Sequence, residues 1–286
     1  MADDLKKIKG YGLGSVDTVI SVDHVAEQAS QLIENAPSTE DLLRLANNEP
    51  VLRIDNLVAG YGKMEILHGF SLAVARGQSL CLIGPNGAGK STVLHSIYGF
   101  TDIRSGDIFK EDTNVTRLTP NNKLKKARIA YILQDNSVFP EMTVEENLLM
   151  GGFLLDDQKH AKAEMEKVLD KYPRLGDRHR QNAGSLSGGE RRLLEISRAL
   201  IMNPDVLLVD EPSIGLEPKF IDNVFEILDD LQKKEHKTII MVEQNAKKGL
   251  EFADLGYVLV SGQLAMADDA SKLLSTPEVG RLFLGG

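Results

Sequence analysis

The sequence predicts an α/β protein whose core is a mainly parallel β-sheet covered by helices. Short apolar runs with the length of buried strands recur along the chain, and segments with the polar–apolar spacing of helices separate them. The strand-length runs fall at 128–133, 205–209, 238–242 and 256–260, and a clear helical segment between them is 220–233. Strands that alternate with helices are typical of parallel sheets, because each helix carries the chain back across one face of the sheet.

An antiparallel β subdomain is predicted to precede this core, near 51–80. Residues 51–58 alternate between apolar and polar side chains, as in a strand with one buried face. Two further strand-like runs follow at 71–75 and 79–83, with an Arg-Gly turn between them.

A mostly helical subdomain is predicted at roughly 136–202. Residues 158–172 and 190–202 both show helical spacing, and the chain between them lacks strand-length apolar runs. Together with the β subdomain and the parallel sheet, these helices are expected to form one domain over 51–286.

Residues 1–50 form a separate, acidic extension. They carry nine acidic and four basic side chains. An apolar stripe at helical spacing predicts one helix, and a second short helix is expected at about 39–47 with Ser38 or Thr39 as its N-cap. The stripe consists of Val22, Val25, Ala26, Ala29, Leu32 and Ile33. Two interpretations stay open, namely an extension without chemistry of its own and a helical arm that packs on a partner subunit.

The composition excludes several classes of protein. The net charge of −9 argues against a protein that coats nucleic acid. The single cysteine, Cys81, excludes an intrachain disulfide framework and fits a reducing compartment. No apolar run reaches the roughly 20 residues that a membrane-spanning helix needs, and the first residues lack the apolar core of a secretory signal. Work at a membrane would therefore require recruitment by another subunit.

A phosphate-binding loop is the most specific motif in the chain. The stretch fits the pattern G-x-x-x-x-G-K-[ST], whose glycines let backbone N–H groups surround an anion. Lys90 can reach the β- and γ-phosphates of a nucleoside triphosphate, and the Ser91 hydroxyl can bind Mg²⁺. The loop comprises Gly84, Pro85, Asn86, Gly87, Ala88, Gly89, Lys90, Ser91 and Thr92. A helix that begins near Lys90 would direct its N-terminal dipole at the same phosphates.

Two carboxylates follow the buried strand at 205–209. Asp210 stands at the strand end, where its oxygens suit Mg²⁺ beside a triphosphate. Glu211 comes next and is placed to orient or deprotonate an attacking water. Together with the phosphate loop upstream, this pair predicts hydrolysis of a nucleoside triphosphate.

The stretch 185–190, Ser-Leu-Ser-Gly-Gly-Glu, lies between these two motifs. By itself it admits two interpretations, a second anion-binding helix start and a simple capping box of Ser187 with Glu190. In this position Leu-Ser-Gly-Gly-Glu resembles the signature motif of the ATP-binding cassette (ABC) ATPases, and the resemblance covers about 51–286. It implies a P-loop NTPase fold of ABC type. It also implies that two cassettes pair head to tail, so that Ser187, Gly188 and Gly189 contact ATP bound by the partner.

Other positions match the same family. Tyr61 resembles the aromatic residue that stacks on adenine, and Gln134 resembles the glutamine that senses Mg²⁺ and couples to the membrane subunit. The simpler alternatives are a turn tyrosine at the sheet edge and an exposed loop glutamine. The loop 213–218 resembles the segment that crosses the dimer interface, with Glu217 where the family usually has Asp.

Gln244, which follows the last core strand, indicates which subfamily of ABC ATPases the chain resembles. The family usually places a γ-phosphate-contacting histidine where this chain has Gln244, whose amide can donate a hydrogen bond but carries no charge. The stretches 242–246 and 139–148 resemble one ATPase of bacterial importers for branched-chain amino acids and related amides. Such importers imply a second ATPase, membrane permease subunits, a periplasmic binding protein and a place on the cytoplasmic face of the inner membrane. Gln134, where this type often has Glu, and the long extension depart from that pattern.

Three other functions are compatible with parts of the sequence. ATPases that extract lipid or lipopolysaccharide share the Leu-Ser-Gly-Gly-Glu-Arg-Arg stretch, but they normally keep the histidine that Gln244 replaces. Soluble ABC ATPases that act on ribosomes or DNA have two cassettes or long coiled coils, and this chain has neither. A subunit that binds nucleotide without turnover would lack Lys90 or Glu211, and both are present.

Overall fold

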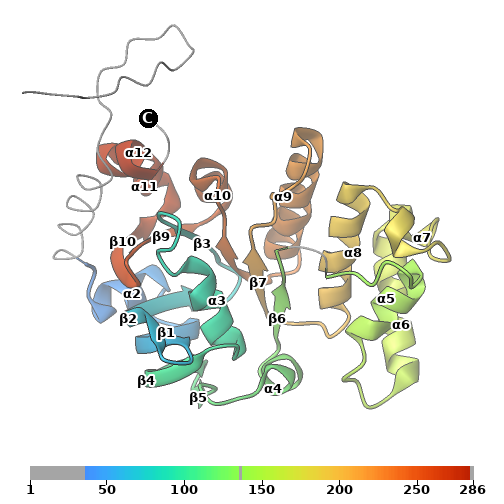
Figure 1. Ribbon diagram of the computed structural model, residues 1–286, viewed down its shortest axis with the longest axis horizontal. Helices are drawn as coiled ribbons and strands as arrows, with labels where there is room; N and C mark the ends of the chain where they lie inside the picture. The colour runs from blue at the N-terminus through green and yellow to red at the C-terminus, as the bar shows by residue number, and fades with distance from the viewer. Residues whose placement is uncertain (1–35, 135–136, 284–286) are drawn as a thin grey trace, which may run out of the picture.

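Two β-sheets and a separate group of helices make up the protein in the computed structural model, which describes residues 36–134 and 137–283 (Figure 1). The larger sheet has six strands in the order β10-β9-β3-β8-β7-β6. Its strands are β3 (Ser79–Ile83), β6 (Ile129–Ile132), β7 (Val206–Asp210), β8 (Thr238–Val242), β9 (Leu255–Val260) and β10 (Gln263–Asp269). All neighbours are parallel except β9 and β10, which form an antiparallel hairpin. The predicted α/β core is therefore confirmed.

The parallel strands are buried on both faces because helices and the second, antiparallel sheet cover them. Every residue of β3, β7 and β8 is buried, as continuous apolar runs predict for a covered parallel strand. The helices beside this sheet are α3 (Lys90–Tyr98), α4 (Pro120–Lys125), α9 (Pro218–Lys233), α10 (Ala246–Phe252), α11 (Ala270–Ser275) and α12 (Pro277–Phe283). The carboxyl ends of β3, β7 and β8 lie next to one another in the sheet, and this arrangement brings distant parts of the sequence together.

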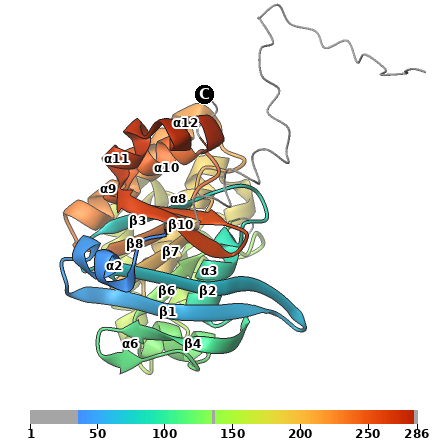
Figure 2. The ribbon, with the colours of Figure 1, turned by 90° about the vertical axis from the view of Figure 1, so that its left-hand side faces the viewer.

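The second sheet is antiparallel and has the strand order β2-β1-β4-β5. Its strands are β1 (Pro50–Tyr61), β2 (Met64–Ala75), β4 (Asp102–Lys110) and β5 (Thr113–Asn114). Figure 2 shows this sheet crossing beneath the parallel one. The antiparallel subdomain is thus confirmed, with different bounds: 79–83 belongs to the parallel sheet, and 102–114 joins the antiparallel one. Exposed polar side chains interrupt β4, so its alternation is too weak to be recognised.

A group of helices lies at the opposite end of the molecule from the antiparallel sheet (Figure 1). It consists of α5 (Val144–Gly151), α6 (Gln158–Lys171), α7 (Pro173–Gly176), a 3₁₀ turn (Ala183–Ser185) and α8 (Gly188–Leu200). These helices share a small core that includes Leu148, Leu175 and Leu194. The N-terminal half of α8 therefore belongs to this group, while Ile196 and Leu200 pack against the parallel sheet.

The short helix α2 (Thr39–Leu45) begins at an N-cap, Ser38, which forms a capping box with Asp41. Leu42 and Ala46 are buried in the main hydrophobic core, and Gln78 donates from its Nε2 to the carbonyl of Leu45 at 3.0 Å. A domain boundary at residue 50, as the sequence predicts, would therefore separate α2 from the sheet against which it packs. The apolar stripe of the extension lies outside the described residues.

Lys123 on α4 is fully buried, and its Nζ has no hydrogen-bond partner within 36–134 and 137–283. Burial lowers the pKa of Lys123 to about 8. Between about pH 8 and its ordinary pKa, the unfolded chain binds a proton that the folded chain does not, so stability rises with pH across that window. We expect Lys123→Met to raise the free energy of unfolding at pH 7 by about 2 kcal/mol and to reduce this pH dependence.

Urea denaturation of both chains at pH 7 and pH 9.5 checks this expectation. Lys126→Met is the matched control, because Lys126 lies one turn away on the same segment and is exposed. Its effect should stay below about 1 kcal/mol. Equal effects of the two substitutions would show that burial of the Lys123 amine is not the source of the instability.

Candidate functional site

The phosphate loop joins β3 to α3 at the carboxyl edge of the parallel sheet. Gly84 has φ +147°, and a Cβ there would lie 2.2 Å from the carbonyl oxygen of Leu259. Gly89 has φ +100° and is the N-cap of α3, which has no side-chain cap. The loop therefore requires glycine at both positions. The first N–H groups of α3 face the space that an anion would take.

Lys90 lies across this loop. Its Nζ donates to the carbonyl oxygens of Gly84 at 2.9 Å and Pro85 at 3.0 Å. Burial lowers the pKa of Lys90, and the carboxylates of Glu211 and Asp210 oppose that shift. Phosphate oxygens could replace the two carbonyls as partners of the ammonium group.

Asp210, at the end of β7, is buried and hydrogen-bonded through both carboxylate oxygens. Ser91 donates from Oγ to Oδ1 at 3.1 Å, and Tyr131 donates from its hydroxyl to Oδ2 at 2.7 Å. Burial, together with the nearby Asp210 charge, raises the pKa of Tyr131, so the phenol keeps its proton and remains a donor. The serine and aspartate that the sequence assigns to Mg²⁺ are thus neighbours.

Glu211 and Gln134 also lie together, although 77 positions separate them. Gln134 donates from Nε2 to Oε2 of Glu211 at 2.8 Å. Glu211 has φ +43°, a backbone conformation that is uncommon outside glycine and is often found at functional sites. Its backbone N–H donates to the carbonyl of Val242 at 2.8 Å, which links the ends of β7 and β8. The parallel sheet therefore brings the predicted water-activating acid beside the predicted metal-sensing amide.

Tyr61 stands at the tip of the β1–β2 hairpin and is 41% exposed. Its hydroxyl is hydrogen-bonded to Nδ1 of His95 on α3. The two rings meet edge to face, with centroids 6.1 Å apart. Burial lowers the pKa of His95, which favours the neutral ring. This contact places the tyrosine ring next to the helix that carries the phosphate loop.

Gln244 follows β8 and is exposed. Its backbone carbonyl accepts a hydrogen bond from the N–H of Ala246 at 3.0 Å. The side chain of the next residue, Asn245, caps α10 by accepting a hydrogen bond from the N–H of Lys248. Because β8 lies between β3 and β7, Gln244 leaves the sheet at the same edge as the phosphate loop and Glu211.

Ser187, Gly188 and Gly189 form the start of α8, on the far side of β7 and β6 from α3 (Figure 1). Ser187 makes the capping box with Glu190, and Arg178 lies 3.3 Å from that carboxylate. Burial raises the pKa of Glu190, but the Ser187 hydrogen bonds and nearby arginines outweigh it and lower the pKa. In the described part of the chain, no hydrogen bond or ion pair joins this segment to the phosphate loop.

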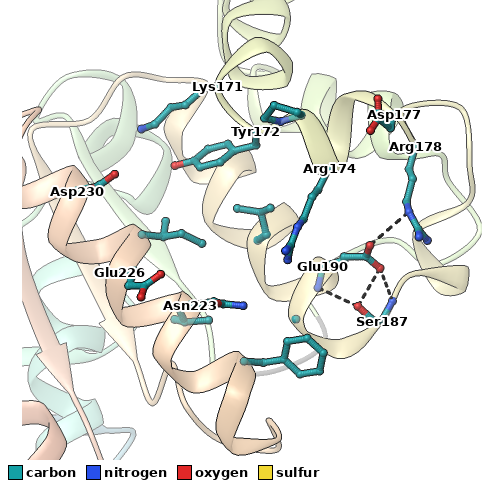
Figure 3. Close-up of a pocket in the computed structure, with 16 residues that line it drawn as sticks. Lys171, Tyr172, Arg174, Asp177, Arg178, Ser187, Glu190, Asn223, Glu226 and Asp230 are labelled. Carbon is teal, nitrogen blue, oxygen red and sulfur yellow. Dashed lines mark hydrogen bonds and ion pairs between the residues drawn. The ribbon is translucent and has the colours of Figure 1, made fainter.

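Figure 3 shows the cavity that the start of α8 lines together with α7 and α9. Its volume is about 790 Å³. Gly189 packs so closely on α9 that a Cβ would lie 2.6 Å from Cδ1 of Phe220. Ser187 and Glu190 form one rim of the cavity, so the signature segment borders open space.

Sequence reasoning missed a buried ion pair on α8. Arg192 is 4% exposed and lies 2.7 Å from the carboxylate of Glu195. Arg192 also donates to the carbonyls of Leu133 at 2.7 Å and Asp210 at 3.4 Å, while Glu195 accepts from the Ser137 N–H at 3.2 Å. The pair therefore attaches α8 to the chain on both sides of Gln134, at Leu133 and at Ser137. The only signal in the sequence is an Arg and a Glu three residues apart that flank two leucines.

The fold and these motifs define an ATP-binding cassette, and comparison with known proteins agrees. Residues 67–214 match the ABC transporter family, and the chain belongs to that family. The high-affinity branched-chain amino acid transport ATP-binding protein BraG of Pseudomonas aeruginosa is 43% identical over 82% of this chain and 100% of its own length. A probable branched-chain amino acid transport ATP-binding protein, LivF, of Archaeoglobus fulgidus is 37% identical over 82% of this chain and 99% of its own.

A solved cassette of an ABC transporter in its ADP conformation has 29% identity and a TM-score of 0.73, and it covers 83% of this chain and 99% of that one. The chain is thus a nucleotide-binding ATPase subunit of the transporter type. Among the described residues, no helix is both long and apolar enough to cross a membrane.

Proposed function

We propose that this chain hydrolyses ATP to power a membrane importer of branched-chain amino acids or a related polar solute. The observation that supports the solute class is the high similarity, over their entire or nearly entire length, to two ATP-binding proteins named for branched-chain amino acid transport. Gln244 in place of the usual histidine is consistent with that subfamily and argues against the alternative of lipid or lipopolysaccharide extraction.

In this proposal the nucleotide lies along the edge of the sheet where β3, β7 and β8 end. Tyr61 stacks on adenine, the phosphate loop and the start of α3 surround the phosphates, and Lys90 exchanges its two carbonyl partners for phosphate oxygens. Glu211 accepts a proton from the attacking water. The left-handed backbone of Glu211 and the hydrogen bond from the Gln134 amide orient the carboxylate for this role. Gln244 donates to the γ-phosphate.

The residues beside Asp210 fit a bound Mg²⁺. Ser91, Asp210 and Gln134 offer hydroxyl, carboxylate and amide oxygens, which are the ligands that Mg²⁺ prefers, and a nucleotide would supply the rest. When bound, the ion would neutralise charge on the phosphates. Tyr131 holds the carboxylate of Asp210 in place through its 2.7 Å hydrogen bond.

A second cassette is proposed to complete the site. Ser187, Gly188 and Gly189 lie away from the phosphate loop of their own chain, so they would act on ATP bound by a partner. Such pairing makes the isolated monomer nearly inactive. Whether the partner is a second copy or a different cassette, the same surface of α8 would meet it.

A permease subunit is proposed to bind a groove of about 320 Å³ beside the Gln134 loop. Met150 and Phe153 line it, and Phe153 is 76% exposed, which is unusual for a large apolar side chain. Glu195 and Arg198 of α8 line the same groove. The loop that contains Gln134 would thereby relay closure of the ATP site to the membrane. The proposal includes a position on the cytoplasmic face of the membrane and a periplasmic binding protein as an indirect partner.

Uptake by cells that lack this chain tests the proposal. Deletion should reduce uptake of radiolabelled leucine, isoleucine and valine by about tenfold or more, because the proposed ATP site needs two paired cassettes and one of them would be missing. The wild-type chain should restore uptake, and Lys90→Ala should not, since loss of the ammonium group removes charge-assisted hydrogen bonds to phosphate. Lysine uptake is the control. Unchanged uptake of all three branched-chain amino acids would refute this solute class.

A further inference from the structure

The side chain of Glu243 joins two loops of the candidate site. It lies at the end of β8, directly before Gln244, and is 2% exposed. Its Oε1 accepts a hydrogen bond from Oγ of Ser213 at 2.7 Å and another from the backbone N–H of Asn245 at 3.0 Å. The carboxylate therefore fixes the segment on both sides of Gln244 to the loop that follows Glu211.

These two loops are also joined through their backbones. The N–H of Glu211 donates to the carbonyl of Val242 at 2.8 Å, one residue before Glu243. Ser213, two residues after Glu211, then makes the second attachment through its side chain. Two attachments so close together leave little freedom for one loop to move without the other.

The packing around Glu243 holds its side chain in this position. A Cβ on Gly249 of α10 would lie 3.1 Å from Cβ of Glu243 and 2.5 Å from Sγ of Cys81, so α10 approaches closely. The second oxygen, Oε2, is buried and has no hydrogen-bond partner among the described residues. Burying a polar atom without a partner costs free energy. Packing alone would be served better by an apolar residue, which indicates that the carboxylate has a purpose besides stability.

We propose that Glu243 and Ser213 are positioning residues that set Gln244 against the γ-phosphate. The loop 213–218 resembles the segment that crosses the dimer interface, so contact with a partner cassette would reach Gln244 through this hydrogen bond. Gln244 carries no charge, and the strength of its contact depends on direction more than a charged group's would. This inference rests on the proposed function of Gln244.

Equilibrium binding of fluorescent ATP and ADP analogues to the full chain tests it. Ser213→Ala should weaken ATP binding about three- to tenfold, the effect of one hydrogen bond, and leave ADP binding unchanged. Ser213→Thr keeps the hydroxyl and should retain ATP affinity. In a Gln244→Ala background, Ser213→Ala should have no further effect, because it acts through Gln244. Glu243→Ala removes the acceptor of both hydrogen bonds and should resemble Ser213→Ala; if it does not fold, the serine variants still decide.

The outcomes distinguish the positioning role of Glu243 and Ser213 from the proposed contact of Gln244 with the γ-phosphate. Equal loss of ATP and ADP affinity in Ser213→Ala, or continued loss in the Gln244→Ala background, would show that the pair serves general stability and overturn the inference. An unchanged ATP-to-ADP affinity ratio in Ser213→Ala, with a lowered ratio in Gln244→Ala, would also overturn it while leaving the role of Gln244 intact. If Gln244→Ala itself leaves the ratio unchanged, the proposed γ-phosphate contact fails, and the inference fails with it.

Discussion

Glu211→Gln is expected to reduce ATP turnover by about 10²- to 10⁴-fold, the usual contribution of a general base. Glutamine keeps the size of the side chain and can still meet the Gln134 amide, which lies 2.8 Å from the carboxylate, but it cannot accept a proton. ATP binding should survive, because the phosphate loop and Lys90 are unaltered. ATP should therefore accumulate on paired cassettes, which light scattering with and without nucleotide would detect.

The matched control for this experiment is Glu251→Gln. Glu251 is exposed and pairs with Lys247 at 4.0 Å on α10, so the same chemical change occurs outside the candidate site and the 213–218 loop. Its turnover should stay within about twofold of the wild type, as expected of an exposed pair. A Glu211→Gln chain with the wild-type rate would remove Glu211 as the base.

Arg192→Ala is expected to lower the free energy of unfolding by about 3–5 kcal/mol, because it leaves the buried Glu195 carboxylate without its partner. It also removes the hydrogen bonds to the carbonyls of Leu133 and Asp210. Glu195→Gln should cost less, since the amide oxygen can still accept from Arg192. Urea denaturation followed by circular dichroism would measure both.

Arg191→Ala provides the comparison for this second prediction. Arg191 is the adjacent residue on α8 and is exposed, so its removal should change stability by less than about 0.5 kcal/mol. Similar losses for the two arginines would mean that the buried contacts of Arg192 contribute little.

The parallel core could be predicted from the sequence because each of its strands is a continuous apolar run. The antiparallel sheet was harder, since β4 carries exposed Asp, Arg and Ser side chains that hide its alternation. Its partner β1 lies more than 40 residues earlier in the chain, and such pairing depends on tertiary contacts that local patterns do not record.

In the candidate site too, local motifs could be predicted from the sequence, and contacts between distant residues could not. The phosphate loop, the acidic strand end and the start of α8 are contiguous stretches, so the first two could be predicted from their residues and the third from its resemblance to the signature motif. Tyr131, Arg192 and Glu243 each form a hydrogen bond with a residue 30 to 79 positions away in the sequence. Only the fold reveals such contacts, because nothing in their immediate sequence distinguishes them from ordinary strand or helix residues.

The close approach of Gly189 to Phe220 affects how mutants of the signature segment must be interpreted. An alanine at this position would push against the aromatic ring and shift α8 relative to α9, even with no nucleotide or partner present. Loss of activity in such a mutant would therefore combine a steric defect within one chain with any lost contact between chains. Gly188 is the cleaner position for measuring contact with the partner's nucleotide, because a Cβ there would lie 3.7 Å from a side-chain methyl of Leu216, at ordinary contact distance, whereas Ser187 also caps α8.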